Sequence, residues 1–397
     1  MPYRFTFIVC ALLWFARSAV AAGDDGKMRF WQAQRKGANC FNTAVDHSYF
    51  ADCKAAKIGL VRLTWSKWKG AGRDFLIGDA DQFKGIPHSD LAKLREVLDA
   101  ADAEGVRIVV VPLSLPGLRW RQQNGMKWDD RIWRDEAYHA QAAAFWRELA
   151  TALRHHPAVV GYNLINEPAP ARAMKIELTD AASHRAFEKQ VAGTPADVNR
   201  LYRTLIEAVR AVDKDTPIVL ESHNFGAPDA IGGLEPIAGD DRVLYSVHNY
   251  GRWQFVNFKA NAGKNSYPGV MTIDDRQETW DKEALRRALA PVAQWAEEHR
   301  IPPTRIFLGE FGCDRRVSGV TEYMTDVIAV ANDYGWPWAF YAYREDEWDA
   351  MDYELGTAKL GGKYWEAIER GERPPLPRKD NPLWRVIARE FEQPPSP

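Results

Sequence analysis

Cysteine is scarce in this sequence, with four residues among 397. One of them, Cys10, lies in an N-terminal segment that we expect to be removed, which leaves Cys40, Cys53 and Cys313. An odd number of cysteines in an exported chain suggests at most one disulfide and one free thiol. Cys40 and Cys53 are closest in sequence and form the expected bridge, and three unpaired buried thiols are the alternative.

Long hydrophobic runs are also absent, so no later stretch predicts a transmembrane helix. The N-terminus joins a basic Arg4 to an apolar segment, residues 5–16, which is too short to cross a bilayer. An A-x-A pattern of small residues follows at 19–21. This arrangement is typical of a secretory signal peptide. We therefore predict a signal peptide at residues 1–22, cleaved near Ala21 or Ala22, and export to the periplasm or the medium without a membrane anchor. A buried first helix is the alternative.

Charge of neither sign is in excess, because 52 basic and 54 acidic side chains leave a net charge of −2. A nearly neutral chain gives no indication of a nucleic-acid or polyanion partner. The histidines are scattered, and the pair His155-His156 is interpreted as a helix end, so neither a metal site nor a cofactor is predicted. The phosphate-binding motifs G-x-G-x-x-G and G-x-x-x-x-G-K are missing, which argues against a doubly wound nucleotide-binding sheet.

Short apolar segments alternate with segments of helical spacing along most of the chain. Eight segments are predicted strands: 35–42, 58–65, 106–113, 159–168, 217–221, 243–247, 305–310 and 337–343. Helices are predicted over 49–56, 91–103, 136–154, 196–212, 282–299 and 320–334 and near 384–391, with a long polar connection over 169–194. This alternation predicts an α/β fold, a single-domain (β/α)8 TIM barrel over residues 23–397 with enlarged mouth-side loops and a short proline-rich tail. A doubly wound open sheet is the main alternative.

Acidic residues end two of the predicted strands. Glu167 follows an apolar run and precedes Pro168, which has no N–H to donate and should end the strand. Glu310 ends the seventh strand. The carboxyl ends of barrel strands meet at one mouth, so the two carboxyl groups are expected to face each other there. Side-chain alternation predicts two shared faces: Asn163 and Ile165 with Glu167, and Ile306 and Leu308 with Glu310.

Two carboxyl groups at one opening are what the cleavage of a glycosidic bond requires. One must be held protonated to donate to the leaving oxygen, and the other must be ionised to attack or stabilise the anomeric carbon. The alternatives are that Asn-Glu-Pro at 166–168 is only the start of a loop and that Glu310 is only a loop acid. A lone charge in the second strand, Arg62, also needs a partner if it is buried.

With these motifs the chain resembles the glycoside hydrolase family 5 cellulases and their relatives in clan A. The resemblance covers most of the chain after the signal peptide and rests on NEP at the fourth strand, H-N-Y at the sixth and GEFG at the seventh. Their order and spacing together are more specific than any one motif. The resemblance implies that Glu167 is the acid/base and Glu310 the nucleophile, with retention of configuration.

Further site residues are implied by the same resemblance. Asn166 would bind the sugar 2-hydroxyl, while His248 and Tyr250 would line the reacting subsite, with the Tyr250 hydroxyl near the nucleophile. Arg62 would pair with Glu310 and keep it ionised. A structural ion pair for Arg62 and a satisfied core histidine for His248 are the alternatives. Stacking surfaces for sugar are expected from about half of the mouth-side tryptophans at 65, 68, 120, 128, 253 and 348, and the predicted substrate contacts are Trp65, Trp120, Trp253, Tyr341 and Trp348.

The sequence departs from the family pattern at two strands. Family members commonly end the third strand in a histidine before Pro-Gly, where this chain has Ser114. The eighth strand commonly carries a tryptophan under the reacting sugar, and here the nearest matches are Tyr341 and Tyr343. Both changes affect the subsite of the reacting ring.

The sequence therefore predicts an exported, monomeric, retaining β-glycoside hydrolase that acts on a β-linked glucan oligo- or polysaccharide. A mannanase, a β-1,3-glucanase or an exo-β-glucosidase on the same scaffold are alternatives within the enzymes. A non-hydrolytic carbohydrate-binding or polysaccharide-assembly protein is the alternative from another class, because a fold does not by itself determine a function.

Overall fold

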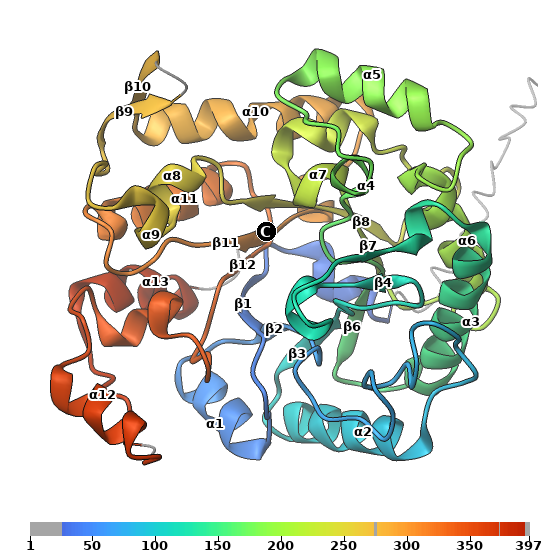
Figure 1. Cartoon of the computed structure of the whole chain (residues 1–397), viewed down its shortest axis with the longest axis horizontal. Helices are drawn as coiled ribbons and strands as arrows, with labels where there is room; N and C mark the ends of the chain where they lie inside the picture. The colour runs from blue at the N-terminus through green and yellow to red at the C-terminus, as the bar shows by residue number, and fades with distance from the viewer. Residues whose placement is uncertain (1–25, 274–275, 373, 394–397) are drawn as a thin grey trace, which may run out of the picture.

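Eight parallel strands form a closed barrel at the centre of the protein, in the order β1-β12-β11-β8-β7-β6-β3-β2 (Figure 1). The computed structural model describes residues 26–273, 276–372 and 374–393, so the predicted signal peptide lies outside the described residues. The barrel strands are β1 (Lys36–Cys40), β2 (Leu60–Leu63), β3 (Arg107–Val110), β6 (Val159–Asn163), β7 (Ile218–Glu221), β8 (Val243–Asn249), β11 (Ile306–Phe311) and β12 (Trp338–Phe340). The eight predicted strands and the TIM barrel are confirmed.

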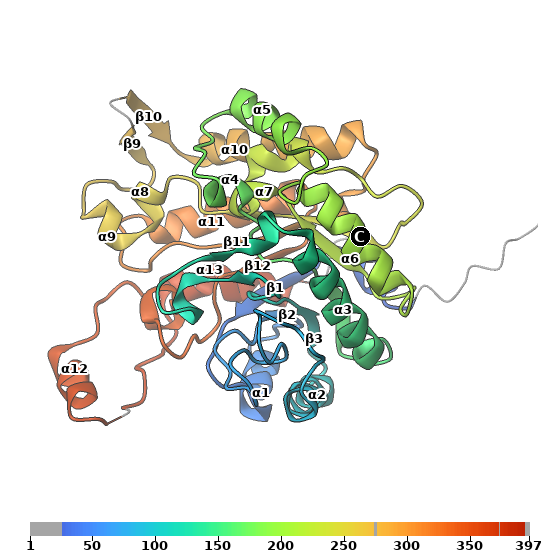
Figure 2. The same cartoon turned by 45° about the vertical axis from the view of Figure 1, so that its right-hand side comes forward.

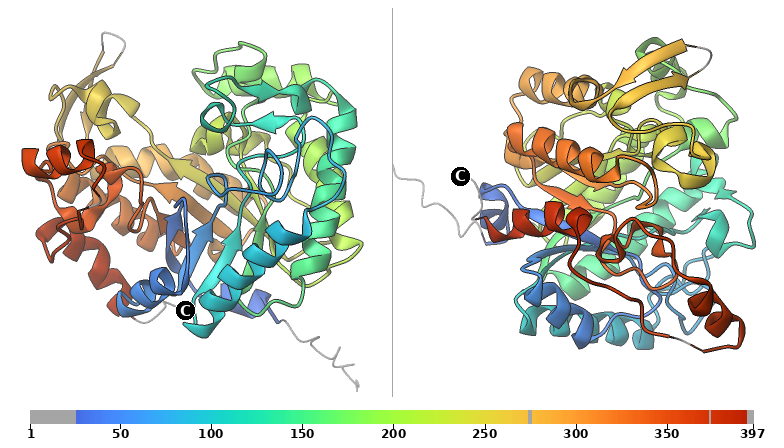
Figure 3. Two further views of the ribbon diagram at one scale, coloured as in Figure 1. Left: turned by 60° about the horizontal axis from the view of Figure 1, so that its bottom comes forward. Right: turned by 90° about the vertical axis from the view of Figure 1, so that its left-hand side faces the viewer.

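Helices surround the barrel, as the turned views also show (Figures 2 and 3). Those that match the predicted segments are α1 (His47–Ala55), α2 (His88–Ala103), α3 (Glu136–Leu153), α6 (Val198–Arg210), α10 (Lys282–Glu298), α11 (Val320–Asp333) and α13 (Pro382–Glu392). Aspartates cap four of the helices of the outer layer by accepting a backbone N–H of the first turn, namely Asp46, Asp135, Asp197 and Asp281. Each such cap is worth about 1 kcal/mol.

Further elements lie in segments that were expected to be loops. They are α4 (Pro170–Ala173), α5 (Ala181–Val191), α7 (His223–Gly226), α8 (Trp253–Val256), α9 (Phe258–Asn261), α12 (Gly362–Glu369) and the two-stranded pairs β4 (Leu118–Arg119) with β5 (Asp129–Asp130) and β9 (Gly269–Ile273) with β10 (Arg276–Trp280). The polar connection predicted over 169–194 thus contains two helices, α4 and α5, that were not predicted. Helix α5 forms because Asp180 caps it and because Phe187 and Val191 share one buried face, while its other faces are polar and exposed.

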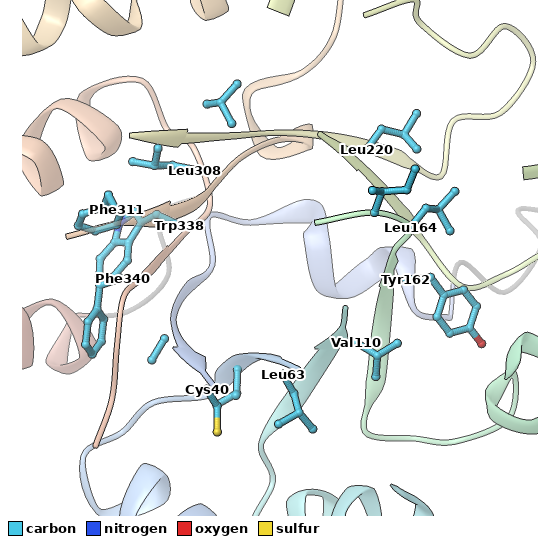
Figure 4. Close-up of a cluster of buried hydrophobic side chains, with 14 of the residues drawn as sticks. Cys40, Leu63, Val110, Tyr162, Leu164, Leu220, Leu308, Phe311, Trp338 and Phe340 are labelled. Atoms are coloured by element: carbon cyan, nitrogen blue, oxygen red, sulfur yellow. The ribbon is translucent and has the colours of Figure 1, made fainter. Parts of the chain in front are cut away.

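Two apolar layers hold the barrel and its helices together. Outward-facing strand residues pack under the helices, and Figure 4 shows several of them, among them Leu63, Val110 and Leu308, around the ring of strands. The second layer fills the interior of the barrel with one residue from most strands: Leu60, Val109, Val160, Val219, Leu244, Phe307 and Ala339. Trp31, from the short 3-10 helix η1 (Met28–Gln32), packs against this inner layer and donates its indole N–H to the carbonyl of Val160 over 2.8 Å. The inner layer is therefore apolar, and the polar level around Arg62 lies above it, at the mouth.

A β-bulge in β11 decides which way Glu310 points. Leu308 pairs with Val247 of β8, and the next paired residue is Glu310 with His248, so Gly309 is the extra residue. Leu308 belongs to the outer layer, as Ile306 does, whereas Glu310 contacts residues inside the mouth. The prediction that Glu310 shares a face with Ile306 and Leu308 is therefore wrong, because the bulge shifts the alternation by one residue.

The strand that precedes Glu167 also ends earlier than predicted. β6 stops at Asn163, and the chain turns before Glu167, whose φ of +49° lies in the left-handed region. Asn163 points inward and contacts Arg62, whereas Ile165 packs in the outer apolar layer. The shared face predicted for Asn163, Ile165 and Glu167 is therefore also wrong, and Glu167 reaches the mouth from a turn.

The cysteines are not bridged. Cys40, Cys53 and Cys313 are all free and buried, so the expected Cys40–Cys53 disulfide is wrong. Burial raises the pKa of the Cys40 thiol to about 12, which keeps it protonated and unreactive. Among the described residues, no helix combines the length and the apolar character needed to cross a membrane.

Candidate active site

Arg62 is the centre of the polar level at the mouth of the barrel. Its side chain extends inward from β2, is completely buried, and uses all five of its N–H groups. Nε donates to Asn163 (2.9 Å), Nη1 to Asn39 (3.0 Å) and Glu310 (2.5 Å), and Nη2 to Asn166 (2.7 Å) and Glu221 (2.8 Å). A buried guanidinium is tolerated only with such complete pairing. Arg62 therefore links five of the eight strands or the turns that follow them.

Glu167 is held between a histidine and a carboxylate. Its Oε1 accepts a hydrogen bond from Nδ1 of His248 over 2.8 Å, and its backbone N–H donates to Oε2 of Glu221 over 2.6 Å. Burial raises the pKa of Glu167 to about 7, although the bond from His248 acts in the opposite direction. A carboxyl group with a pKa near neutrality can both donate and accept a proton at working pH.

Glu310 has a different environment at the end of β11. Its Oε1 accepts from Nη1 of Arg62 over 2.5 Å, and its Oε2 accepts from the hydroxyl of Tyr250 over 3.1 Å. One carboxylate oxygen of Glu310, one of Glu167 and one ring nitrogen of His248 all lie within 4.8 Å of one another. Glu167 and Glu310 thus meet across one opening, from β6 and β11, as the sequence predicted.

His248 is charged in this arrangement. Burial lowers its pKa, but the surrounding carboxylates Glu221, Glu310 and Glu167 outweigh burial and raise it to about 10. Nε2 of His248 lies 3.4 Å from Oε1 of Glu221. The trio of Glu167, His248 and Glu310 is compact enough to hold a metal ion, but an imidazolium has no free lone pair for one. We therefore assign these atoms to proton and charge placement.

A cleft of about 1490 Å³ opens beside the carboxyl pair. Glu167, His248 and Tyr250 line it, and so do aromatic rings from separate loops: Trp120, Trp128, Phe225, Trp253 and Trp280. Trp120 and Trp128 are 5.0 Å apart between ring centroids, and Trp120 is 6.3 Å from Phe225. Trp253 exposes 56% of its surface, which is unusual for such a large apolar side chain. The cleft thus offers several flat stacking faces within reach of the carboxyl pair.

Comparison with known proteins assigns this arrangement to a family. Residues 24–347 match the model of the cellulase family, glycosyl hydrolase family 5. The chain belongs to glycoside hydrolase family 5. The resemblance stated from the motifs is confirmed, and the protein is a glycoside hydrolase of the β-specific cellulase family. No curated protein sequence matches the chain.

Solved structures with the fold of this family 5 hydrolase include endoglucanases. Endoglucanase Cel5A of Pseudomonas stutzeri has a TM-score of 0.60 and 17% identity over 91% of this chain and 96% of that chain. Cel5A of Thermotoga maritima, in complex with mannotriose, has a TM-score of 0.58 and 15% identity over 80% and 91%. The cellulose synthase subunit Z of Clostridioides difficile has a TM-score of 0.55 and 18% identity over 78% and 92%. At these identities the similarity establishes the fold.

The predicted aromatic contacts of the hydrolase fall into three groups. Trp120 and Trp253 line the cleft. Tyr341 is partly buried beside Phe41, with centroids 5.0 Å apart, and the half-exposed Trp348 lies 6.3 Å from it. Trp65 is only 3% exposed and lines a separate cavity of about 170 Å³ together with Ser114, which leaves little of its ring for a sugar.

Tyr341 and Tyr343, the nearest matches to the family tryptophan, have different surroundings. Ala339 faces the barrel interior, so strand alternation brings Tyr341 to the inner side of the mouth. Tyr343 is buried elsewhere: its ring stacks on Trp384 of α13, and its hydroxyl donates to the carbonyl of Asp52. Tyr341 therefore occupies the mouth-side position.

Sequence reasoning missed Glu221, the last residue of β7. This side chain is completely buried and touches Arg62, His248 and the backbone of Glu167. Burial acts to raise its pKa, but His248 and Arg62 outweigh burial and lower it to about 2, so it is ionised at all working pH values. The sequence PIVLE at 217–221 could have predicted this role of Glu221. An acidic residue that ends a barrel strand faces the same mouth as Glu167 and Glu310.

Proposed function

We propose that this hydrolase cleaves internal linkages of a β-linked glucan by double displacement with retention of configuration. The distance between the two carboxyl groups supports this most directly: one oxygen of Glu167 lies within 4.8 Å of one oxygen of Glu310. Retaining enzymes hold the two carboxyl groups about 5–5.5 Å apart, whereas inverting enzymes need about 6.5–9.5 Å to admit a water molecule.

Glu310 is the nucleophile in this proposal and Glu167 the acid/base. In the first step Glu310 attacks the anomeric carbon while Glu167 donates its proton to the leaving oxygen, which forms a glycosyl-enzyme ester. In the second step Glu167, now ionised, takes a proton from water, and the water oxygen displaces Glu310 from the anomeric carbon. The charged His248, 2.8 Å from Glu167, stabilises the anion that exists between the two steps.

Arg62 and Tyr250 are positioning residues for Glu310, since each donates to a different oxygen of its carboxylate. Asn166 accepts from Arg62 through its Oδ1, so its amide nitrogen is oriented away from the arginine and can donate to the sugar 2-hydroxyl. These fixed donors require no reorganisation during the reaction, which is the main source of catalysis by such sites.

A glucan substrate is favoured by the cleft and its rings. Its volume of about 1490 Å³ exceeds the roughly 300–1,000 Å³ of small-ligand pockets, which suits several sugar units better than one. Similar solved structures include endoglucanases, among them Cel5A of Thermotoga maritima, whose structure was also determined with mannotriose. A β-mannan is therefore the second candidate substrate. We also propose that the enzyme is exported and acts as a monomer outside the cytoplasm.

Two isosteric variants test the proposed roles. Glu310→Gln and Glu167→Gln should each lower kcat on a β-glucan by about a hundredfold or more, because each removes a group that acts in the transition state. Exposed Glu207 on α6 supplies the matched control, Glu207→Gln, which should keep full activity. NMR of the first product released from β-glucan should show the β-anomer. An α-anomer, or a Glu310→Gln enzyme with most of its activity, would contradict the mechanism.

A further inference from the structure

A cluster of metal-binding side chains lies outside the carboxyl pair, in the wall formed by α5, α7 and the 3-10 helix η4 (Pro228–Gly233). Figures 1 and 2 both show α5 beside α4 and α7 at the rim of the barrel. His184 and Glu188 are one helical turn apart on α5, and His223 opens α7 directly after β7. One ligand atom from each of these three residues lies within 4.8 Å of the others.

The two histidines have unused ring nitrogens although they are buried. His184 is 2% exposed, and neither of its ring nitrogens has a hydrogen-bond partner. His223 is 5% exposed; its Nε2 lies 2.9 Å from Oε1 of Glu188, and its Nδ1 has no partner. Each buried polar atom without a partner costs about 1–3 kcal/mol. Three such atoms in one cluster are therefore costly, and a ligand that accepts imidazole lone pairs would satisfy one nitrogen of each ring.

The surrounding residues are arranged to turn these side chains toward one another. The rings of His184 and His223 have centroids 5.2 Å apart. A Cβ atom on Gly233 would lie 2.1 Å from Oε1 of Glu188, so the carboxylate of Glu188 occupies space that the glycine leaves free. Asp229 of η4 has an oxygen 3.7 Å from Nε2 of His184, and its half-exposed carboxylate reaches the solvent. The cluster thus has a fourth acidic group on its open side.

We propose that His184, Glu188 and His223 form a structural site for a zinc-type divalent cation, with Asp229 or water as the fourth ligand. Two neutral imidazoles and a carboxylate match the tetrahedral nitrogen and oxygen ligands of zinc, whereas calcium and magnesium prefer oxygen ligands throughout. Tetrahedral ligation places the ligand atoms roughly 3.3–3.5 Å apart. The ligand atoms of the cluster lie within 4.8 Å of one another, so the most distant pair needs to approach by about 1.5 Å at most. This site departs from the expectation that no metal is bound, which scattered histidines suggested.

Such a cation would link α5 to the loop that follows β7. That loop follows Glu221, which belongs to the polar level at the mouth, and it carries Phe225, which lines the cleft. The cation would act by holding this wall in place, since none of its ligands belongs to the carboxyl pair. Its effect is therefore expected on stability and on cleft geometry, independently of the substrate that the enzyme cleaves.

Zinc titration of the chelator-treated protein tests the site. Zn²⁺ competing with a chromogenic chelator should bind at one equivalent per chain and should raise Tm by several degrees, because it binds only the folded state. His184→Gln and His223→Gln should weaken binding at least about tenfold, and so should Glu188→Gln, whose partly exposed side chain makes misfolding a minor concern. The matched control is His155→Gln, since His155 is exposed and far from the cluster in sequence.

Zinc binding at this site must be distinguished from binding at the other histidine-carboxylate cluster, formed by Glu167, His248 and Glu310. Glu310→Gln alters the trio in the active site and should leave zinc stoichiometry and affinity unchanged. Cobalt bound in place of zinc should show the visible absorption of a tetrahedral centre in the wild-type protein and lose it in Glu188→Gln. Absence of zinc binding, equal binding by all variants, or binding that is lost only in Glu310→Gln would each overturn the proposal.

Discussion

Glu221 balances the charges beneath the reacting groups. Arg62 and His248 bring two positive charges to the polar level, and Glu221 and Glu310 bring two negative ones. With these four charges paired, Glu167 can keep its proton without leaving the cluster with a net charge. The elevated pKa of Glu167 thus arises from its burial together with the repulsion from Glu310 and Glu221.

Removal of the Glu221 charge should change the pH dependence of catalysis. In Glu221→Gln the repulsion on Glu167 decreases, so its pKa falls and it loses its proton at lower pH. The alkaline limb of the kcat/KM profile, which reports the essential acid of the free enzyme, should shift to lower pH by about 0.5–1 unit. Steady-state kinetics across pH provides the measurement.

A purely structural role for Glu221 would give a different result. The variant would then lose stability and total activity, while the position of the alkaline limb stayed that of the wild type. Glu207→Gln on the exposed side of α6 is the control for a change of net charge alone. A limb that does not move in Glu221→Gln while the protein remains folded would refute the electrostatic role.

At the scale of one element, the bulge in β11 is what brings Glu310 into the mouth. Regular alternation after Phe307, which faces inward, would turn residue 309 inward and residue 310 outward. The extra residue reverses this. Space at this residue is small: a Cβ on Gly309 would lie 2.5 Å from Oγ of Ser246 and 3.2 Å from Nε2 of His248.

Gly309→Ala should therefore damage the site without changing any of its functional groups. The added methyl group forces Ser246 or His248 to move, which should cost about 1–3 kcal/mol of unfolding free energy and lower kcat. Gly59→Ala is the matched control, since a Cβ at Gly59 meets no atom within 4 Å. Urea unfolding and kcat measured on both variants test this. Equal behaviour of the two variants would show that the bulge tolerates a side chain.

At the scale of the whole molecule, the buried charges make stability depend on pH in both directions. Glu221, with its pKa lowered from 4.5 to about 2, contributes stability above pH 4.5 that is lost as pH falls toward 2. His248, raised from 6.5 to about 10, contributes stability below pH 6.5 that is lost as pH rises through 10. The pKa of Glu167 is raised from 4.5 to about 7, so its contribution to stability is present below pH 4.5 and is lost as pH rises through 7.

Glu167 should accordingly reduce stability at alkaline pH. Glu167→Gln removes a carboxyl group that ionises at lower pH in the unfolded chain than in the folded protein. Relative to wild type, the variant should gain about 1–3 kcal/mol of unfolding free energy between about pH 5 and about pH 8. Urea unfolding at the two pH values measures this, with Glu207→Gln as the control. A constant difference between variant and wild type would contradict the elevated pKa.

Much of the fold and part of the site followed from local sequence patterns. Apolar runs, proline and glycine stops, and helical spacing are properties of neighbouring residues, so the eight strands and the outer helices were predicted from them. Glu167, Glu310 and Arg62 were found because each is a polar residue where its apolar strand ends or is interrupted. Those features are visible before the chain folds.

Only the tertiary structure decided how those residues meet. The bulge at Gly309, the pairing of Glu221 with Arg62 and His248, and the approach of His184 to His223 each depend on strands or helices that are distant in sequence. Closure of the barrel brings these segments together, and the hydrogen bonds and charges of the partners then determine the direction and protonation of each side chain. A sequence lists donors and carboxyl groups, but their pKa values and separations are set by neighbours that only the folded chain supplies.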